Sequence, residues 1–161
     1  MKVICQCGAC SFPLKDKRPQ ALYHCHCVEC RRQSASAFST SAKFPASSFF
    51  PLPPEIMANM SCYNRPTDSG GSKDCYFCKK CGVRLFHLAR NKDGSLKDTV
   101  SVKGGCIEGL NWKDAQHIYC KTAVVPISGI AKSWEEEPEK SKEYKGVMKF
   151  MPRLWARHVT S

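Results

Sequence analysis

The cysteines with spacings suited to chemistry fall into three short clusters. The first has three cysteines in six residues, Cys25-His26-Cys27-Val28-Glu29-Cys30. The second is the Cys-x-Cys pair of Cys5 and Cys7, and the third is the Cys-x-x-Cys pair of Cys78 and Cys81, which precedes Gly82. Structural zinc takes four protein ligands, whereas catalytic zinc keeps one position open. These seven cysteines therefore predict one closed zinc site with four sulfurs and one open site with three.

The closed site is expected to combine the Cys-x-Cys pair with the Cys-x-x-Cys pair. Cysteines two apart on a strand face the same side, so a strand over 2–7 would direct Cys5 and Cys7 at one ion. Beyond that strand, Cys10 is a less secure candidate ligand. The second pair, Cys78 and Cys81, supplies the remaining two sulfurs of the structural zinc.

Another cysteine competes for this site, because Cys75 forms its own Cys-x-x-Cys pair with Cys78. The residues Lys79-Lys80 before Gly82 offer the tighter reversal, since glycine readily adopts positive φ, and Tyr76-Phe77 makes a poor turn. We therefore interpret Cys75 as a small buried apolar residue. The same interpretation covers the remaining cysteines away from the clusters: Cys62, Cys106 and Cys120.

The open set Cys25, Cys27 and Cys30 leaves its fourth ligand to a distant residue or to an exogenous molecule. In an extended segment His24 and His26 face away from these thiols, so we expect them to lie behind the ligands. His87 is the alternative fourth protein ligand. A purely structural or redox role for this cluster remains the competing hypothesis.

Polar residues beside the open set are candidates for handling substrate. Arg31 and Arg32 follow the cluster directly and could pair with substrate carboxylates, or could simply form an exposed turn. His26 or Glu29 could move a proton during the reaction. We predict these four as site residues beyond the zinc ligands.

The segments between the clusters predict an all-β domain of short antiparallel strands with few short helices. Runs with strand character are separated by turn signals, and no long amphipathic helix is found in 1–130. Pro51, Pro53 and Pro54 are expected to exclude regular structure. The expected strands cover 2–7, 21–24, 35–44, 56–63, 75–78, 83–89, 99–103 and 118–125, with a helical or turn segment over 28–33. Residues 131–161 are predicted to form a charged extension, partly packed on the domain of residues 1–130.

Bulk composition bounds the location and the partners of the chain. It has 161 residues, 12 cysteines and a formal charge of +11, which falls to about +8 once thiolates bind two zinc ions. No apolar run suits a signal peptide or a membrane span, so we expect a reducing, cytoplasmic setting. In that setting close cysteine spacings favour metal binding over disulfides. The basic residues are scattered, which makes nucleic acid a weaker partner than a small molecule. The sequence leaves the oligomeric state open, with a homodimer among the options.

Three motifs in their order along the chain carry a family resemblance: Cys5-Gln6-Cys7-Gly8-Ala9, then Cys25-His26-Cys27-x-x-Cys30-Arg31-Arg32, then Phe77-Cys78-x-x-Cys81-Gly82. Together they resemble the glutathione-dependent formaldehyde-activating enzyme family, which also includes centromere protein V. The resemblance covers about residues 3–125, and the stretches 102–109 and 118–126 are similar to fungal members.

The resemblance implies an Mss4-like fold and two zinc ions with different roles. It assigns the structural zinc to Cys5, Cys7, Cys78 and Cys81, and the catalytic zinc to Cys25, Cys27 and Cys30. It implies a carbon–sulfur lyase-type enzyme that joins a thiol such as glutathione to a carbonyl compound such as formaldehyde, giving S-(hydroxymethyl)glutathione. There are two alternatives. The enzyme could act on another thiol or carbonyl metabolite, or the chain could be a non-catalytic module that binds nucleic acid or protein.

Three thiolate ligands donate charge to zinc and reduce its Lewis acidity. We therefore expect the open position to hold a substrate thiol as thiolate, in preference to activating water.

Overall fold

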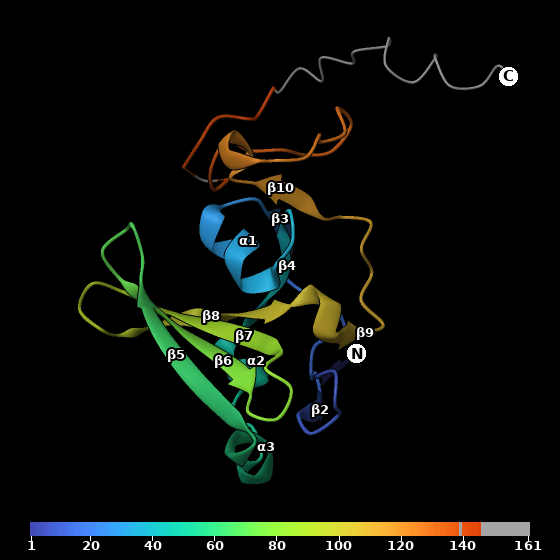
Figure 1. Cartoon of the computed structure of the whole chain (residues 1–161), viewed down its shortest axis with the longest axis vertical. Helices are drawn as coiled ribbons and strands as arrows, with labels where there is room; N and C mark the ends of the chain where they lie inside the picture. Colours follow the sequence, from blue (N-terminus) through green and yellow to red (C-terminus); the bar gives the residue numbers. More distant parts are fainter. Residues whose placement is uncertain (139, 146–161) are drawn as a thin grey trace, which may run out of the picture.

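The computed structural model describes residues 1–138 and 140–145, which form two β-sheets and a few short helices (Figure 1). The large sheet has the spatial order β10-β3-β4-β8-β7-β6-β5, and the small sheet has the order β2-β1-β9. Neighbouring strands are antiparallel except β10 and β3, which run parallel. The prediction of an all-β fold is therefore confirmed.

The strands of the large sheet are β3 (Ala21–Cys25), β4 (Ser39–Pro45), β5 (Met60–Pro66), β6 (Ser72–Cys78), β7 (Arg84–Arg90), β8 (Leu96–Lys103) and β10 (Gln116–Ile118). The small sheet contains β1 (Lys2–Ile4), β2 (Ser11–Pro13) and β9 (Ile107–Glu108). The helices are α1 (Val28–Ser34), α2 (Ala46–Phe49) and α3 (Pro54–Ala58), with single 3-10 turns η1 (Gly104–Cys106) and η2 (Cys120–Thr122).

The two sides of the large sheet differ in chemistry, because successive side chains on a strand alternate between them. One side is apolar and buried, and it packs against α2, whose Phe49 lies 4.9 Å from Phe86 and 5.5 Å from Phe12 between ring centroids. We call the other side the polar face. Strand register places on it Cys25 of β3, Ser39 and Ser41 of β4, Ser101 and Lys103 of β8, His87 of β7, and Lys73 and Cys75 of β6.

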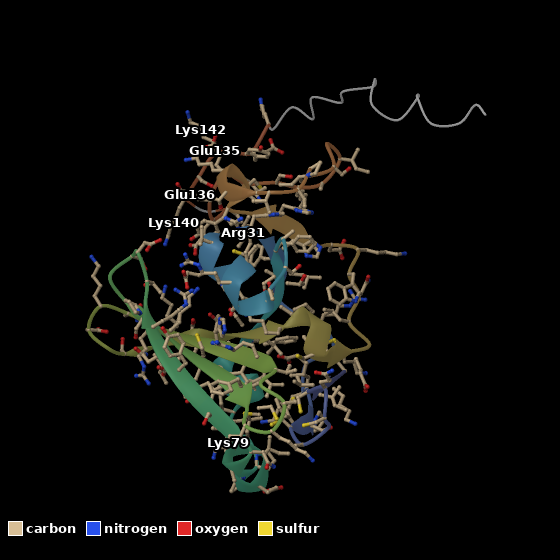
Figure 2. All side chains as sticks on the ribbon, viewed as in Figure 1. Arg31, Lys79, Glu135, Glu136, Lys140 and Lys142 are labelled. Carbon is tan, nitrogen blue, oxygen red and sulfur yellow. The ribbon has the colours of Figure 1, made fainter. Side chains whose placement is uncertain are left out.

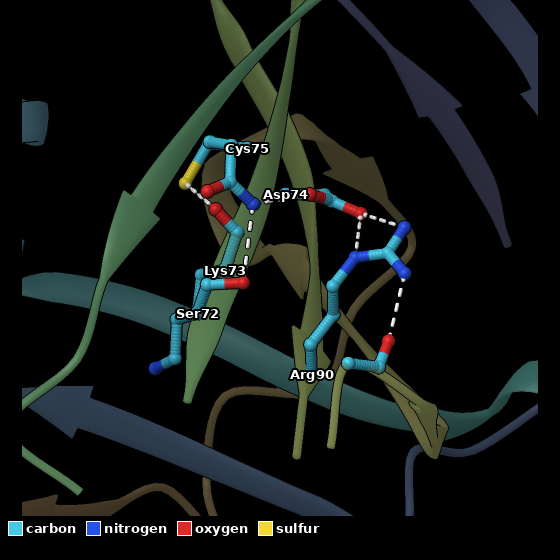
Figure 3. A network of polar contacts seen from close by, with 7 residues as sticks. Ser72, Lys73, Asp74, Cys75 and Arg90 are labelled. Carbon is cyan, nitrogen blue, oxygen red and sulfur yellow. Dashed lines mark hydrogen bonds and ion pairs between the residues drawn. The ribbon is translucent and has the colours of Figure 1, made fainter. Parts of the chain in front are cut away.

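The outer strands of the large sheet are joined by a charged contact on the side opposite the polar face. Asp74 of β6 accepts hydrogen bonds from Arg90 Nε of β7 at 2.8 Å and from Asn64 Nδ2 of β5 at 2.6 Å. Figure 3 shows Arg90 turning toward Asp74, and the same guanidinium donates to the Gly94 carbonyl at 3.0 Å. The contact therefore links three strands and the turn between β7 and β8.

Several predicted elements have different bounds in the structure. The strand predicted over 2–7 ends at Ile4, because the chain turns back there with the Cys5 N–H bonded to the Cys10 carbonyl at 3.0 Å. The prediction that Pro51, Pro53 and Pro54 exclude regular structure was wrong, since Pro54 begins α3. Proline is tolerated in the first helical turn, where its missing N–H would have no helical partner.

Two further strand predictions were wrong over part of their range. The strand predicted over 56–63 begins as α3 and becomes β5 only at Met60. The strand predicted over 118–125 is restricted to Gln116–Ile118 and is followed by η2. The helical prediction over 28–33 is confirmed by α1.

The segment after residue 130 contacts the β10 edge of the large sheet, at the top of Figure 1. Ser133 forms an isolated parallel bridge with His117, and Trp134 donates from Nε1 to Gln116 Oε1 at 2.9 Å. Lys121 pairs with Glu135 and Glu136 at 3.3 Å each. The rest of the predicted extension, at 139 and 146–161, lies outside the described residues. None of the helices described here has the length and apolar character needed to cross a bilayer.

Candidate metal centres

Cys5, Cys7, Cys78 and Cys81 come together, with their four sulfurs all within 4.8 Å of one another. The Sγ atoms of Cys5 and Cys7 are 3.6 Å apart, and those of Cys7 and Cys78 are 3.7 Å apart. Zinc–sulfur bonds of about 2.3 Å in a tetrahedron place sulfurs roughly 3.8 Å apart. The geometry therefore fits one four-thiolate metal ion, and all twelve cysteines of the chain are free thiols.

Both halves of the four-cysteine centre are tight turns closed by glycine. Gly8 and Gly82 have φ of +77° and +73°, values that side chains disfavour. The Gly8 N–H donates to the Cys5 carbonyl at 3.0 Å, and the Gly82 N–H donates to the Cys78 carbonyl at 2.9 Å. Cys5 and Cys7 thus converge through a turn, whereas the sequence predicted that a strand would align them.

Cys10 lies beside this centre without joining it. Its backbone N–H donates to Cys5 Sγ at 3.3 Å, and its own thiol donates to the Asn59 carbonyl at 3.6 Å. Burial and the nearby Cys78 raise the pKa of Cys10 to about 12, so it stays protonated. By contrast, the Val83 N–H lowers the pKa of the Cys81 thiol to about 6, which favours a thiolate ligand.

A second group of three sulfurs is formed by Cys25, Cys27 and Cys30, also within 4.8 Å of one another. Cys25 is the last residue of β3, Cys27 is the N-cap of α1, and Cys30 lies in its first turn. The Cys27 sulfur accepts the Cys30 N–H at 3.4 Å, so helix formation itself brings Cys30 to the cluster. No fourth histidine, cysteine or carboxylate from the described part of the chain joins this group.

The three thiols are close enough to share protons. Hydrogen bonds from Cys25 and then Cys27 lower the pKa of Cys30 to about 2, while the bond to Cys27 raises that of Cys25. Three thiolates crowded together require a cation in place of the lost protons, because like charges in one site oppose each other's ionisation. The donor set therefore fits a soft divalent metal such as zinc.

The histidines near the cluster lie on its far side and form a group of their own. His26 Nε2 and His117 Nδ1 are 2.9 Å apart, and His24 Nδ1 is 2.8 Å from Thr40 Oγ1. His26 is fully buried, and burial together with His117 lowers its pKa to about 4. None of these rings joins the three sulfurs, and neither does His87, the alternative fourth ligand of the sequence analysis.

The charged residues predicted to handle substrate are placed along the outer side of α1. Arg32 pairs with Glu29 at 3.0 Å in an exposed contact. Arg31 and Arg32 line a shallow depression that contains none of the clustered cysteines, with Val28, Ala35, Ser36, Ala37 and Val124. In Figure 2 Arg31 extends from α1 on the side of Glu135 and Glu136, while Lys79 lies at the other end of the molecule. Their roles as substrate-binding and proton-moving groups remain predictions.

Two residues near the open cluster were missed by the sequence analysis. Gln33 Nε2 donates to Cys30 Sγ at 3.3 Å, as the spacing of one helical turn allows. Lys103 is buried on the polar face, where its Nζ donates to Ser39 Oγ and Ser41 Oγ at 3.3 and 3.2 Å. The sequence signal for a buried lysine was its position between Val102 and Gly104 at the end of a strand. That signal could be recognised only once the pairing of β4 with β8 was known.

The chain also matches a known protein family over most of its length. The model of the glutathione-dependent formaldehyde-activating enzymes matches residues 1–122, which include both cysteine clusters. No individual curated protein is similar enough to count as a relative of the chain. Because the match spans most of the 161 residues and includes the motifs that form both centres, the chain belongs to the glutathione-dependent formaldehyde-activating enzyme family.

Proposed function

We propose that the chain is a zinc-dependent enzyme of the carbon–sulfur lyase type, similar to S-(hydroxymethyl)glutathione synthase, with two zinc ions per chain. Membership of a family of formaldehyde-activating enzymes supports the reaction class. The observation that carries the proposal is the three-sulfur group on β3 and α1, to which the described residues add no fourth protein ligand. An open position is what distinguishes a catalytic zinc from a structural one.

The two cysteine groups would have separate tasks. Cys5, Cys7, Cys78 and Cys81 would hold the structural ion and tie the N-terminal turn to the β6–β7 turn. Cys25, Cys27 and Cys30 would hold the other ion, which when bound supplies a Lewis-acidic position where a thiol loses its proton. Cys30 is oriented by Gln33, and Cys27 is fixed by capping α1.

The reaction is an addition of a thiol to an aldehyde. The sulfur lone pair forms a bond to the carbonyl carbon, the carbon–oxygen π pair moves to oxygen, and the thiol proton ends on that oxygen. Glutathione and formaldehyde are the proposed partners, because the family is named for them. We place the protein in the cytoplasm, where twelve free thiols would stay reduced.

Exchange spectroscopy by NMR tests the proposal directly. The zinc-loaded protein should accelerate exchange between free formaldehyde hydrate and S-(hydroxymethyl)glutathione. Cys30→Ser should abolish the acceleration, whereas Cys62→Ser, which alters an exposed thiol outside both clusters, should keep it. A fully metal-loaded protein that accelerates exchange of no thiol or carbonyl, yet binds nucleic acid in a salt-dependent way, would favour the non-catalytic module.

A further inference from the structure

Lys103 is a buried cation whose hydrogen-bond partners are neutral. The residue is 7% exposed, and within residues 1–138 and 140–145 its Nζ donates to the hydroxyls of Ser39 and Ser41 alone. Among the described residues it forms no ion pair with a carboxylate. An ammonium group has three N–H donors, so one donor and the full charge are left without a partner. A lysine in such a position keeps its charge only where an anion lies nearby, because an uncompensated buried ammonium is costly and otherwise loses its proton.

The strand register places Lys103 beside the open cysteine cluster. Lys103 is the register partner of Ser41, and Ser39 is the register partner of Cys25, so all four residues share the polar face. Ser39, whose hydroxyl accepts a hydrogen bond from Lys103 Nζ at 3.3 Å, lies directly opposite Cys25 in that register. Burial lowers the pKa of Lys103 itself, and the charges of Cys30 and Cys25 act in the opposite direction.

Among the described strands, the polar face carries further cations and no Asp or Glu. His87 is 6% exposed and its Nε2 has no hydrogen-bond partner within the described part of the chain. Its pKa is lowered first by burial and then by Lys103, Lys73, Arg84 and Arg65. The acidic residue of β6, Asp74, faces the other side of the sheet, where Arg90 neutralises it. The thiolates are thus the available counter-charge for Lys103.

We propose that Lys103 is a positioning residue of the three-cysteine centre, and that it makes the open fourth position select an anionic ligand, a thiolate, over a neutral donor. The inference rests on the proposed function in requiring a metal in that centre. A divalent ion with three thiolates carries one net negative charge, and a fourth thiolate adds another. The Lys103 ammonium offsets one of these charges at a buried site, where water screens little.

Substitution of cobalt for zinc makes ligand binding visible without measuring catalysis. The visible bands of Co²⁺ respond to its fourth ligand, while the four-cysteine centre gives a constant background. We would titrate wild type and Lys103→Met with 2-mercaptoethanol, which binds as a thiolate, and with imidazole, which binds neutral. Lys103→Met should weaken thiolate binding about tenfold or more and leave imidazole binding unchanged, as expected for the loss of one buried charge.

Two matched variants separate charge from shape. Lys103→Arg keeps the charge and should restore most of the thiolate affinity. Lys97→Met removes the same charge from an exposed position on the same strand, roughly 20 Å away along β8, and should bind both probes as wild type does. Equal weakening of thiolate and imidazole in Lys103→Met would overturn the proposal, because it would indicate a purely structural lysine.

A measurement on the unmodified chain covers the case in which Lys103→Met fails to fold. The Nζ resonance of Lys103 in ¹⁵N-lysine-labelled zinc protein should shift on adding 2-mercaptoethanol and stay in place with imidazole. If the thiol binds without moving it, the role of Lys103 is refuted while the proposed function stands. If neither probe binds the wild-type metal, the open position is absent, and both proposals fail together.

Discussion

At the scale of single residues, the surroundings of each cysteine decide whether its thiol joins a metal centre, is buried in the core or is exposed. Spacing predicted the members of each short motif because their sulfurs converge through local backbone, whereas the joining of Cys5 and Cys7 with Cys78 and Cys81 needs the tertiary fold. Cys75, Cys106 and Cys120 are buried, as predicted, but Cys62 is exposed. Cys62 lies on β5, an edge strand of the large sheet, and an edge position cannot be read from composition.

Replacing one ligand in each group should separate structural from catalytic metal. Cys78→Ser should unfold the chain, because a structural zinc contributes folding free energy directly. Cys30→Ser should lose one of two zinc ions and keep its far-UV circular dichroism. Metal analysis of the purified variants checks the counts. Unfolding of Cys30→Ser would show that the three-cysteine centre is structural as well.

The Asp74 carboxylate should make the free energy of unfolding depend on pH in the acid range. The hydrogen bond from Arg90, opposed by burial and aided by Asn64, lowers the pKa of Asp74 below its usual 3.8. The contribution of Asp74 to the free energy of unfolding is therefore complete above pH 3.8, and it is lost as the pH falls through the lower pKa of the folded state. Asp74→Asn should cost about 1–2 kcal/mol at pH 7 and less at pH 3. Urea unfolding at both pH values measures this, and an equal cost at both would contradict it.

At the scale of elements, local signals predicted some segments and tertiary packing decided others. The helical segment after Cys27 and the turn at Gly82 were predicted, since the first follows from its cap and the second from a glycine with positive φ. The helix α3 and the short β10 were not. A short stretch such as the five residues of α3 is compatible with either helix or strand until its neighbours are known. The three-residue β10 is fixed by its pairing with the distant β3.

The turn after β8 depends on close packing that admits no side chain. A Cβ added at Gly104 would lie 2.7 Å from Thr40 Cγ2 and 3.2 Å from Trp112 Cη2, whereas one at Gly105 would meet nothing within 4 Å. Gly104→Ala should therefore destabilise the fold by about 1–3 kcal/mol. Gly105→Ala, the neighbouring control, should change stability by less than about 0.5 kcal/mol. Thermal unfolding of both variants tests this, and equal midpoints would refute it.

At the scale of the whole molecule, the sequence supplied the class of fold but not its topology. Short strands with turn signals predict β structure, whereas the order of seven strands depends on long-range pairing that leaves no local trace. For that reason the polar face, and Lys103 within it, became evident only once β4 and β8 were adjacent. The division at residue 130 between domain and extension remains a proposal.

Loss of the Trp134 contact should release the extension without disturbing the metal centres. Trp134 donates from its ring to Gln116 and from its backbone to the His117 carbonyl at 2.9 Å each. Trp134→Ala should increase proteolytic cleavage after residue 130 severalfold, while zinc content stays at the wild-type value. Ile130→Ala, at a side chain 98% exposed, is the control. Unchanged cleavage would show that the extension is held by other contacts.

The four-cysteine centre joins sulfurs 71 positions apart, Cys7 and Cys78, and this sets an order on events during synthesis. The ribosome releases Cys25, Cys27 and Cys30 within six residues, long before the β6–β7 turn has been translated. A nascent chain thus presents these three thiols to the cellular metal pool before Cys78 and Cys81 exist, while Cys5 and Cys7 near its start still lack their partners. Correct metal partitioning then depends on the later hairpin outcompeting that early cluster for Cys5 and Cys7.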